Sequence, residues 1–440
     1  MALLERFPDW ISLSPKERAG AAEGCRERLA RIGRSLNAVA TIVEAPCEAG
    51  GALGGLPYVA KDMIATGISA PSWGCRIPLS FIPKPALVIQ QLSAAGACLI
   101  GAAEMTELAY EPSGVNVARG HVRNPWNFDH VPGGSSSGSA ALVAAGCAFA
   151  ALGSDTGGSV RIPAHCCGIT ALKPSWGAIA VEGTMPLAPS LDTIGLMARS
   201  AADLSLIWSA LSGPVAPVTT EGITAVVLED AFVASDPEIA RICRAAVSKL
   251  AELGIDLQER TGFPQEADER ALLVLQAEAA RSHREHLEDE RLDPMLSKRL
   301  RKGLTIGDDA LATALAEREP LRTAFLSDLL GTARLAITPV MPIPTPRVAE
   351  VDPASPAFNP RTLYALSRFT RFVNYLGLPA LALPAGFDQR GMPVNLQIIG
   401  HPGSEALLLA VGAALQNETD WHGRMPTAIR DVMIEEGIRA

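Results

Sequence analysis

Glycine and serine are concentrated in two short clusters, at residues 133–138 and 153–159, with an apolar segment at 140–152 between them. Because glycine has no Cβ atom, such loops let backbone N–H groups converge where other residues would not fit. Serine hydroxyls at the same place add a nucleophile to those donors. The combination is typical of an acyl-transfer site, where a serine attacks a carbonyl carbon and N–H groups stabilise the oxyanion.

In the second cluster, Ser159 follows Gly157 and Gly158 and stands at the start of a helix expected at about 158–166. The N–H groups of Thr156, Gly157, Gly158 and Ser159 can converge on an anion there, aided by the helix N-terminus. The same geometry fits a phosphate loop or a plain glycine-rich turn. Neither GxxxxGK(S/T) nor a GxGxxG after a strand occurs, although nucleotide-binding loops carry these motifs.

Lys61 stands inside the apolar segment 56–65, which is expected to be a buried strand. Burial disfavours an ammonium ion and lowers the pKa of a lysine. A lysine that is neutral at pH 7 is a competent general base. The alternative is a lysine at the end of a strand that reaches water or pairs with Asp62.

The first cluster also contains a GxSxG pattern, with Ser136 at its centre. In an α/β-hydrolase this pattern follows a strand, and the catalytic Asp and His come later in the chain. Residues 124–132 do not have the pattern of a strand, and neither His401 nor His422 lies in a convincing catalytic loop. Ser136 is therefore the weaker candidate nucleophile.

Two other groups of polar side chains have simpler explanations. His283 and His286 are three positions apart on an expected charged helix, but no third metal ligand is visible, so a solvated helix face is the better interpretation. Asp155 and Arg161 flank Ser159, and we expect them to form an ion pair that holds the loop.

Apolar strands alternate with amphipathic helices along most of the chain, which predicts an α/β fold with a mixed or parallel sheet. Strands are expected at 36–44, 56–65, 98–105, 148–153, 223–229, 335–344, 379–386 and 393–400, and helices at 14–33, 85–97, 137–146, 158–166, 200–212, 236–253, 361–376 and 403–417. Residues 265–331 are rich in Glu, Arg, Ala and Leu and are expected to form a helical insertion within one domain that spans residues 1–440.

Composition narrows the functional classes. The net charge is −9 and no basic block is present, which argues against nucleic-acid binding. The chain starts without the apolar core of a signal peptide, and no apolar run reaches the ~18 residues that a membrane span needs. The eight cysteines have no CxxC spacing, so free thiols in a reducing cytoplasm are expected, with the pair Cys166-Cys167 serving packing.

Taken together, residues 132–176 resemble the glycine- and serine-rich run of the amidase signature family. Other segments resemble the family too: 55–67 with its lysine, 123–127, 337–346, 375–386 and 392–400. The resemblance is weak at about 215–330 and over the first 35 residues. It implies an α/β fold made of a single large domain, with a central mixed β-sheet covered on both faces by helices.

The resemblance also implies a Ser–Ser–Lys triad. The nucleophile falls on Ser159, the bridging serine on Ser135 after a cis peptide bond, and the lysine on Lys61. The N–H groups from Thr156 through Ser159 would hold the oxyanion. The first cluster reads GGSSSG where many members have GGSSGG, so Ser137 replaces a glycine, but both functional serines remain.

By resemblance, the chain is expected to hydrolyse a primary carboxylic amide to a carboxylate and ammonia through an acyl-enzyme, without metal or organic cofactor. The expected form is a cytoplasmic homodimer with a small-molecule amide as substrate and no nucleic-acid or membrane partner. The alternative is the glutaminase subunit of a tRNA-dependent amidotransferase complex. The usual segment of that subunit is not recognisable before the C-terminal third, and 337–346 looks more like stand-alone amidases.

The acyl pocket is expected to be lined by residues 105–113, by the helix at 361–376 and by the insertion. Tyr110 and Glu111 suggest a small or polar acyl group. Arg368 and Arg371 would meet a carboxylate if they face inward, and the alternative is that both are solvated at the surface.

Overall fold

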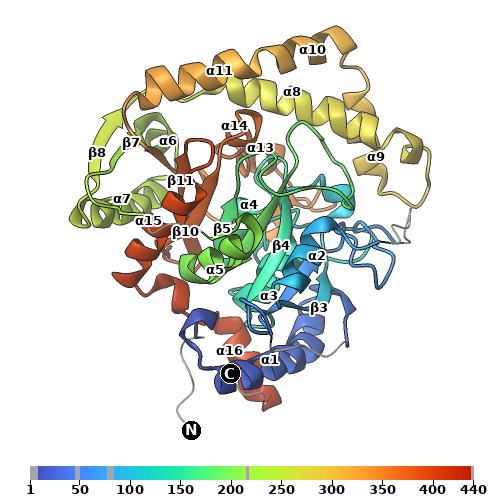
Figure 1. The fold of residues 1–440 in the computed structure, drawn as a ribbon. Helices are drawn as coiled ribbons and strands as arrows, with labels where there is room; N and C mark the ends of the chain where they lie inside the picture. Colours follow the sequence, from blue (N-terminus) through green and yellow to red (C-terminus); the bar gives the residue numbers. More distant parts are fainter. Residues whose placement is uncertain (1–7, 45–49, 77–83, 215–217, 438–440) are drawn as a thin grey trace.

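The computed structural model describes residues 8–44, 50–76, 84–214 and 218–437. These residues form one 11-stranded sheet with the order β1-β3-β2-β4-β6-β5-β10-β11-β9-β7-β8 (Figure 1). The strands are β1 Val39–Ile42, β2 Pro57–Lys61, β3 Cys98–Ala103, β4 Ala150–Asp155, β5 Thr170–Lys173, β6 Thr193–Ala198, β7 Thr224–Leu228, β8 Asp256–Arg260, β9 Leu335–Pro339, β10 Ala380–Phe387 and β11 Pro393–Gly400. Strand β2 is parallel to both β3 and β4, and β7 is parallel to β8 and β9, whereas the other pairs are antiparallel. The expected mixed sheet is confirmed.

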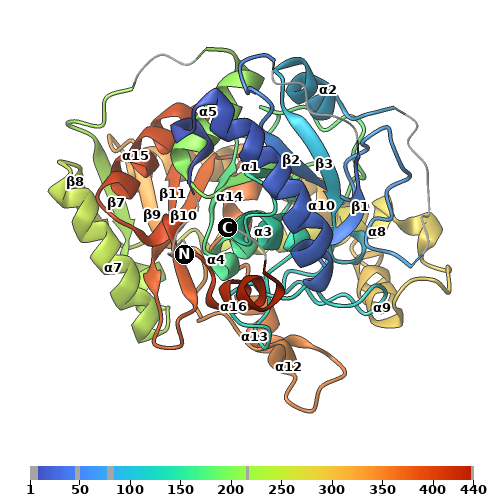
Figure 2. The same cartoon turned by 90° about the horizontal axis from the view of Figure 1, so that it is seen from below.

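Helices cover both faces of this sheet (Figure 1 and Figure 2). They are α1 Pro15–Arg28, α2 Leu87–Ala94, α3 Ser137–Ala144, α4 Arg161–Cys167, α5 Ala201–Ser212, α6 Glu229–Val233, α7 Pro237–Glu252, α8 Gln265–Ser282, α9 Pro294–Gly303, α10 Asp308–Ala316, α11 Arg318–Ala324, α12 Val348–Val351, α13 Pro360–Ala365, α14 Arg371–Tyr375, α15 Glu405–Asn417 and α16 Thr427–Glu436. The C-terminal helix α16 packs against the π-helical turn Leu29–Gly33 that follows α1 (Figure 2).

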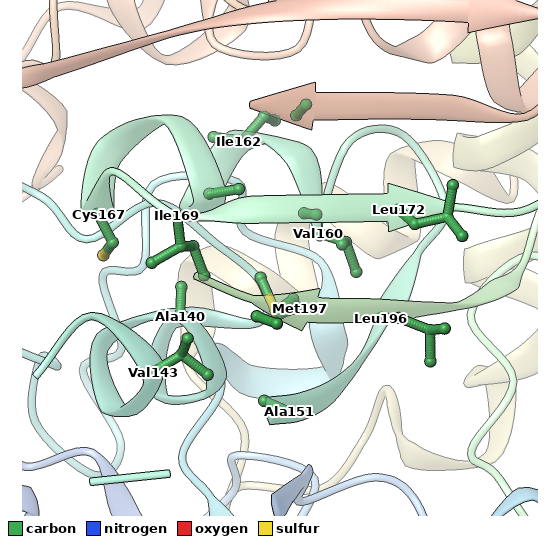
Figure 3. Close-up of a cluster of buried hydrophobic side chains, with 14 of the residues drawn as sticks. Ala140, Val143, Ala151, Val160, Ile162, Cys167, Ile169, Leu172, Leu196 and Met197 are labelled. Carbon is green, nitrogen blue, oxygen red and sulfur yellow. The ribbon is translucent and has the colours of Figure 1, made fainter. Parts of the chain in front are cut away.

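The glycine- and serine-rich run forms the centre of the molecule, as the elements α3, β4, α4 and β5 (Figure 3). All residues of α3 are buried, because its small side chains let the helix approach the sheet closely. A Cβ atom on Gly138 would lie 2.5 Å from the carbonyl oxygen of Glu104. Around these backbones, side chains such as Val160, Leu172 and Leu196 are buried, and each contributes about 1.5–3 kcal/mol of hydrophobic stabilisation. The central location fixes both serine clusters on a rigid core.

The predicted helical insertion is present as α8 to α11, which arch over α13 and α14 in Figure 1. Helix α8 packs against α14, and the two are joined by a bidentate ion pair between Asp268 and Arg371. The ring of Phe263, just before α8, lies 5.4 Å from that of Phe372 in edge-to-face geometry. Because these contacts are specific, the insertion forms one wall over the centre of the sheet.

The single helix expected at 361–376 is instead two short helices, α13 and α14. The break has a physical cause: Thr370 Oγ1 donates a hydrogen bond to Gly157 O at 2.6 Å, and Arg161 Nη2 donates to Thr370 O at 3.1 Å. These long-range bonds replace helical ones. The strands β5, β6 and β8 and the helix α16 are not in the sequence-based prediction. Edge strand β8 has the sequence DLQER, whose charges conceal its extended structure.

Six cysteines are free and buried, as expected: Cys25, Cys75, Cys147, Cys166, Cys167 and Cys243. Cys98 is disulfide-bonded, so the expectation of a free thiol is wrong there, and Cys47 lies outside the described residues. Among the described helices, none has the length and apolar character that a membrane crossing requires.

Candidate active site

Lys61 is the last residue of β2, the strand that lies between β3 and β4, and its side chain is fully buried. Its Nζ lies 2.6 Å from Ser135 Oγ and 2.8 Å from Ser154 Oγ. Burial lowers the pKa of Lys61 to about 7, although the negative charges of Asp155 and Asp192 act in the opposite direction. A neutral amine is therefore available near pH 7 beside a serine hydroxyl, which is the condition for general-base chemistry.

Ser135 is fully buried, and the Gly134–Ser135 peptide bond is cis, as the family resemblance implied. Two backbone bonds fix this step: Gly134 N donates to Pro112 O at 2.7 Å, and Thr106 N donates to Ser135 O at 3.2 Å. The first serine cluster is therefore held by the segment 106–112, which also lines the neighbouring cavity.

Ser159 lies in the turn between β4 and α4, and α4 begins two residues later than expected, at Arg161. Ser136 N donates to Ser159 O at 3.2 Å, which joins the two serine clusters directly. Ser159 is 9% exposed and lines a cavity of about 60 Å³. The structure thus brings Lys61 against Ser135 and places Ser159 beside the same cluster, at the surface of a cavity.

The N–H groups around Ser159 are not equivalent. Gly158 N donates to Asp155 Oδ1 at 2.8 Å, so this group is not free to hold an oxyanion, contrary to the expectation for four donors. In the described part of the chain, the N–H groups of Thr156, Gly157 and Ser159 have no protein acceptor. Gly158 contributes in another way, because its φ of +126° shapes the turn and a Cβ there would lie 2.3 Å from Thr370 Oγ1.

Asp155 and Arg161 form the expected ion pair, and both side chains are fully buried. Arg161 Nε and Nη2 donate to the carboxylate at 3.0 and 2.9 Å. Burial alone would raise the pKa of Asp155, but the Arg161 guanidinium outweighs this effect and holds the pKa well below its usual range. Further donors and acceptors on Asn374 and Gln397 complete the network. The catalytic turn is thereby tied to α14 and β11.

The cavity at Ser159 is lined by residues from three parts of the chain. Its walls are Ala109, Tyr110, Pro112, Thr156, Gly157, Ile162, Leu187, Leu272, Leu275, Gln276, Arg299, Leu363, Tyr364, Ser367 and Arg371. A second cavity of about 180 Å³ shares Arg299, Leu363 and Tyr364 with the first. Arg299 Nη1 donates to Glu111 Oε2 at 2.5 Å, and its guanidinium lies 4.9 Å from the centre of the Tyr110 ring.

The two candidate carboxylate-binding arginines differ. Arg371 lines the cavity, but its guanidinium already donates to Asp268, Ser367 Oγ and Tyr364 O. Arg368 is exposed and does not line the cavity.

The weaker candidates also resolve. Ser136 Oγ is buried and lies 3.3 Å from both N and O of Ser154, so it supports the strand backbone. His283 is only 2% exposed, and burial lowers its pKa to about 4, so the expectation of a solvated face is wrong at this residue. No metal-binding group of three His, Cys, Asp or Glu side chains occurs among the described residues.

Sequence reasoning missed Ser154, Asp268 and Arg299 as residues of the site. Ser154 directly precedes Asp155 in the second cluster, and its position there is the one signal that could have identified it. Asp268 and Arg299 lie in the insertion, where a charged helix gives no indication of which side chain turns inward.

Comparison with known proteins identifies the family. The sequence model described as Amidase matches residues 35–409. A solved structure described as that of an amidase has a TM-score of 0.83 and 29% identity, and the match covers 93% of this chain and 100% of that one. The same fold is therefore present over nearly the whole chain.

Other relatives carry a more specific name, which makes each of them the same subunit of a glutamyl-tRNA(Gln) amidotransferase. The protein from Cyanothece sp. is 31% identical, with 94% of this chain and 93% of that protein covered. The one from Moorella thermoacetica is 34% identical, with 86% and 85% covered. The structure of the one from Thermotoga maritima has a TM-score of 0.80 and 25% identity, with 96% and 99% covered.

These names contradict one expectation. A homodimer that acts on a small-molecule amide without a nucleic-acid partner does not agree with relatives that are named as one subunit of an enzyme of glutamyl-tRNA. The physical reason for the error is that net charge describes only this chain's own surface, whereas a subunit can work beside another protein that holds the nucleic acid. With the family model matched over most of its length and its relatives hydrolysing or transferring amide nitrogen by name, this chain belongs to the amidase signature family and is an amidohydrolase of C–N amide bonds.

Proposed function

We propose that this chain hydrolyses the side-chain amide of glutamine, as the ammonia-supplying subunit of a tRNA-dependent amidotransferase. The observation that carries this assignment is the match of nearly the whole chain, 94% and 86%, to two proteins that are named as the same subunit of such an enzyme. The buried contact of Lys61 Nζ with Ser135 Oγ supports the chemistry. The cytoplasmic location remains a prediction from the sequence.

The proposed mechanism uses Ser159 as the nucleophile. Neutral Lys61 takes a proton from Ser135, which takes one from Ser159 as its Oγ attacks the amide carbon. The N–H groups of Thr156, Gly157 and Ser159 stabilise the oxyanion, and each donor in such a site contributes about 2.7–4 kcal/mol. The relay then returns a proton to the amide nitrogen, and ammonia leaves. Water hydrolyses the acyl-enzyme, so that glutamine and water give glutamate and ammonia.

The cavity supports a zwitterionic substrate. Within the described chain, the hydrogen bonds of Arg299 go to Glu111 alone, so further N–H groups of its guanidinium remain for a ligand. Arg299 lines both cavities, and Glu111 lines the larger one. A cation and a carboxylate side by side complement the α-carboxylate and α-ammonium groups of an amino acid.

We further propose that residues 265–331 are an insertion in a single domain and that they close the cavity. Leu272, Leu275 and Gln276 of α8 line it together with Ser159. The bidentate pair between Asp268 and Arg371 holds α8 over the catalytic turn. A wall of this kind excludes water from the acyl-enzyme until ammonia has left.

The experiment measures ammonia released from glutamine, asparagine and an aryl amide. The full chain is assayed alone and with the other subunits of the amidotransferase of Moorella thermoacetica, with glutamyl-tRNA(Gln) present. We expect release from glutamine, formation of glutaminyl-tRNA in the mixture, and loss of both in Ser159→Ala and Lys61→Ala. Ser139→Ala is the matched control, because its buried Oγ contacts Leu152 O and not the triad.

Two results would overturn parts of this proposal. Hydrolysis of the aryl amide without any release from glutamine, in either mixture, would reject the amidotransferase role and leave amide hydrolysis intact. Activity that survives Ser159→Ala but disappears in Ser136→Ala would reject the triad itself.

A further inference from the structure

Lys61 can act as a base only if the lone pair of its neutral amine is available to Ser135. A neutral Nζ carries two N–H groups and one lone pair. Within the described chain, Nζ has two hydrogen-bond partners, Ser135 Oγ at 2.6 Å and Ser154 Oγ at 2.8 Å. If the hydroxyl of Ser154 donated to Nζ, it would occupy the lone pair and leave Ser135 facing an N–H group.

The direction of the Ser154 hydrogen bond is set by a third residue. Ser154 Oγ donates to the thioether sulfur of Met63 at 3.0 Å, and both side chains are buried. A thioether has no proton to give, so it can only accept. Because the Ser154 proton is directed to Met63, the oxygen of Ser154 accepts an N–H from Lys61. The lone pair of Nζ then stays free for the Ser135 proton.

Ser154 is held firmly enough to serve this purpose. It lies in β4, where it pairs with Ile194 of β6. Ser136 Oγ accepts from Ser154 N and donates to Ser154 O, both at 3.3 Å. Met63 is fixed by its own backbone, since Met63 N donates to Lys61 O at 2.7 Å and Met185 N donates to Met63 O at 3.0 Å. Each atom of the arrangement thus sits on a hydrogen-bonded backbone.

We propose that Ser154 and Met63 are positioning residues that orient the amine of Lys61, so that its lone pair is presented to Ser135. The inference rests on the proposed role of Lys61 as the base, but it does not depend on the identity of the amide. The serine that the GxSxG pattern highlights, Ser136, takes part as the support of Ser154.

The test measures the rate at which a fluorophosphonate labels Ser159, as a function of pH, in the full chain. In this reaction Ser159 Oγ bonds to phosphorus, fluoride leaves, and the hydroxyl proton passes into the relay. We expect Ser154→Ala to lower the plateau rate roughly 10- to 100-fold, a part of the contribution that a positioned base makes. It also removes an acceptor that favours the ammonium form, so the acid limb of the profile moves to lower pH. Ser154→Thr keeps the hydroxyl and restores most of the rate.

Met63→Leu keeps the size and apolar character of the side chain but removes the acceptor. The Ser154 proton is then free to turn to Nζ, and we expect labelling to slow about 3- to 10-fold, the effect of one misdirected hydrogen bond. Ser139→Ala is the control, and it should label at the wild-type rate. Since Met63→Leu tests the direction of the bond independently, loss of folding in Ser154→Ala would leave the proposal testable.

The proposal is overturned if folded Ser154→Ala or Met63→Leu labels at the wild-type rate with an unmoved acid limb. It is also overturned if wild-type Ser159 is not labelled, because the relay would then be absent. Normal labelling of Ser159 in a protein that releases no ammonia from glutamine would count against the glutamine assignment alone.

Discussion

The guanidinium of Arg161 holds the carboxylate of Asp155 through two hydrogen bonds, at 3.0 and 2.9 Å, where neither side chain reaches solvent. The two residues stand at either end of the turn that carries Ser159. Asp155 also accepts the N–H groups of Gly158 and Val160, so one carboxylate shapes the whole turn.

Replacing Asp155 with Asn should therefore destabilise the protein strongly, because it leaves Arg161 charged and buried without its partner. The expected loss is about 3–5 kcal/mol in the free energy of unfolding. Urea denaturation measures it. The control is Glu27→Ala, which breaks an exposed pair with Arg31 and should change stability by less than about 1 kcal/mol. Equal denaturation midpoints for the two variants would contradict the prediction.

The activity should depend on the neutral form of Lys61. Since burial lowers the pKa of Lys61 to about 7, kcat/KM should be constant above that pH and fall about tenfold per pH unit below it. Assays of ammonia release across this range, with stability checked at each pH, measure the profile. A rate independent of pH from about 5 to 8 would show that the amine is not the base.

The same shift affects folding. The unfolded chain keeps this lysine protonated up to its ordinary pKa of 10.5, whereas the folded chain releases the proton above about 7. The unfolded state binds more protons in this window, so Lys61 makes the free energy of unfolding rise with pH from about 7 to 10.5. In Lys61→Met this contribution should disappear, and denaturation of both proteins at pH 7 and 9 compares them. An unchanged slope in the variant would refute it.

Gly158→Ala should abolish activity through the shape of the turn. The new Cβ would lie 2.3 Å from Thr370 Oγ1, where it displaces the hydroxyl that donates to Gly157 O. The control is Gly254→Ala, which has φ +85° and open space around the new Cβ, so it isolates the backbone penalty of about 1–2 kcal/mol. Activity and denaturation are measured for both. Wild-type activity in Gly158→Ala would refute the prediction.

Asp268 and Arg371 should be coupled energetically, because their bidentate contact joins the insertion to the wall of the catalytic cavity. A double-mutant cycle with Asp268→Ala, Arg371→Ala and the double variant should give a coupling of about 1–3 kcal/mol in stability. Asp268→Ala should also raise KM, since Arg371 loses its anchor. Additive effects on stability, with KM unchanged, would show that the two helices are held by other contacts.

The sequence by itself determined the chemical elements of this protein. The two serine clusters, Lys61 within an apolar strand and the alternation of strands and helices identified the family and most of the sheet, because these features are local patterns of residue type and periodicity. Edge strand β8 escaped because it is charged, and the helix expected at 361–376 broke because Thr370 bonds to a residue far away in sequence.

The tertiary structure decided which side chains meet. The sheet order places β2 beside β4, and only this neighbourhood brings Ser154 and Met63 to Lys61. It also commits the N–H of Gly158 to Asp155, and it carries Arg299 of the insertion to the cavity at Ser159. Local patterns encode burial and periodicity, but contacts between residues many tens of positions apart arise from the packing of whole elements, and that packing selects the partners of each catalytic group.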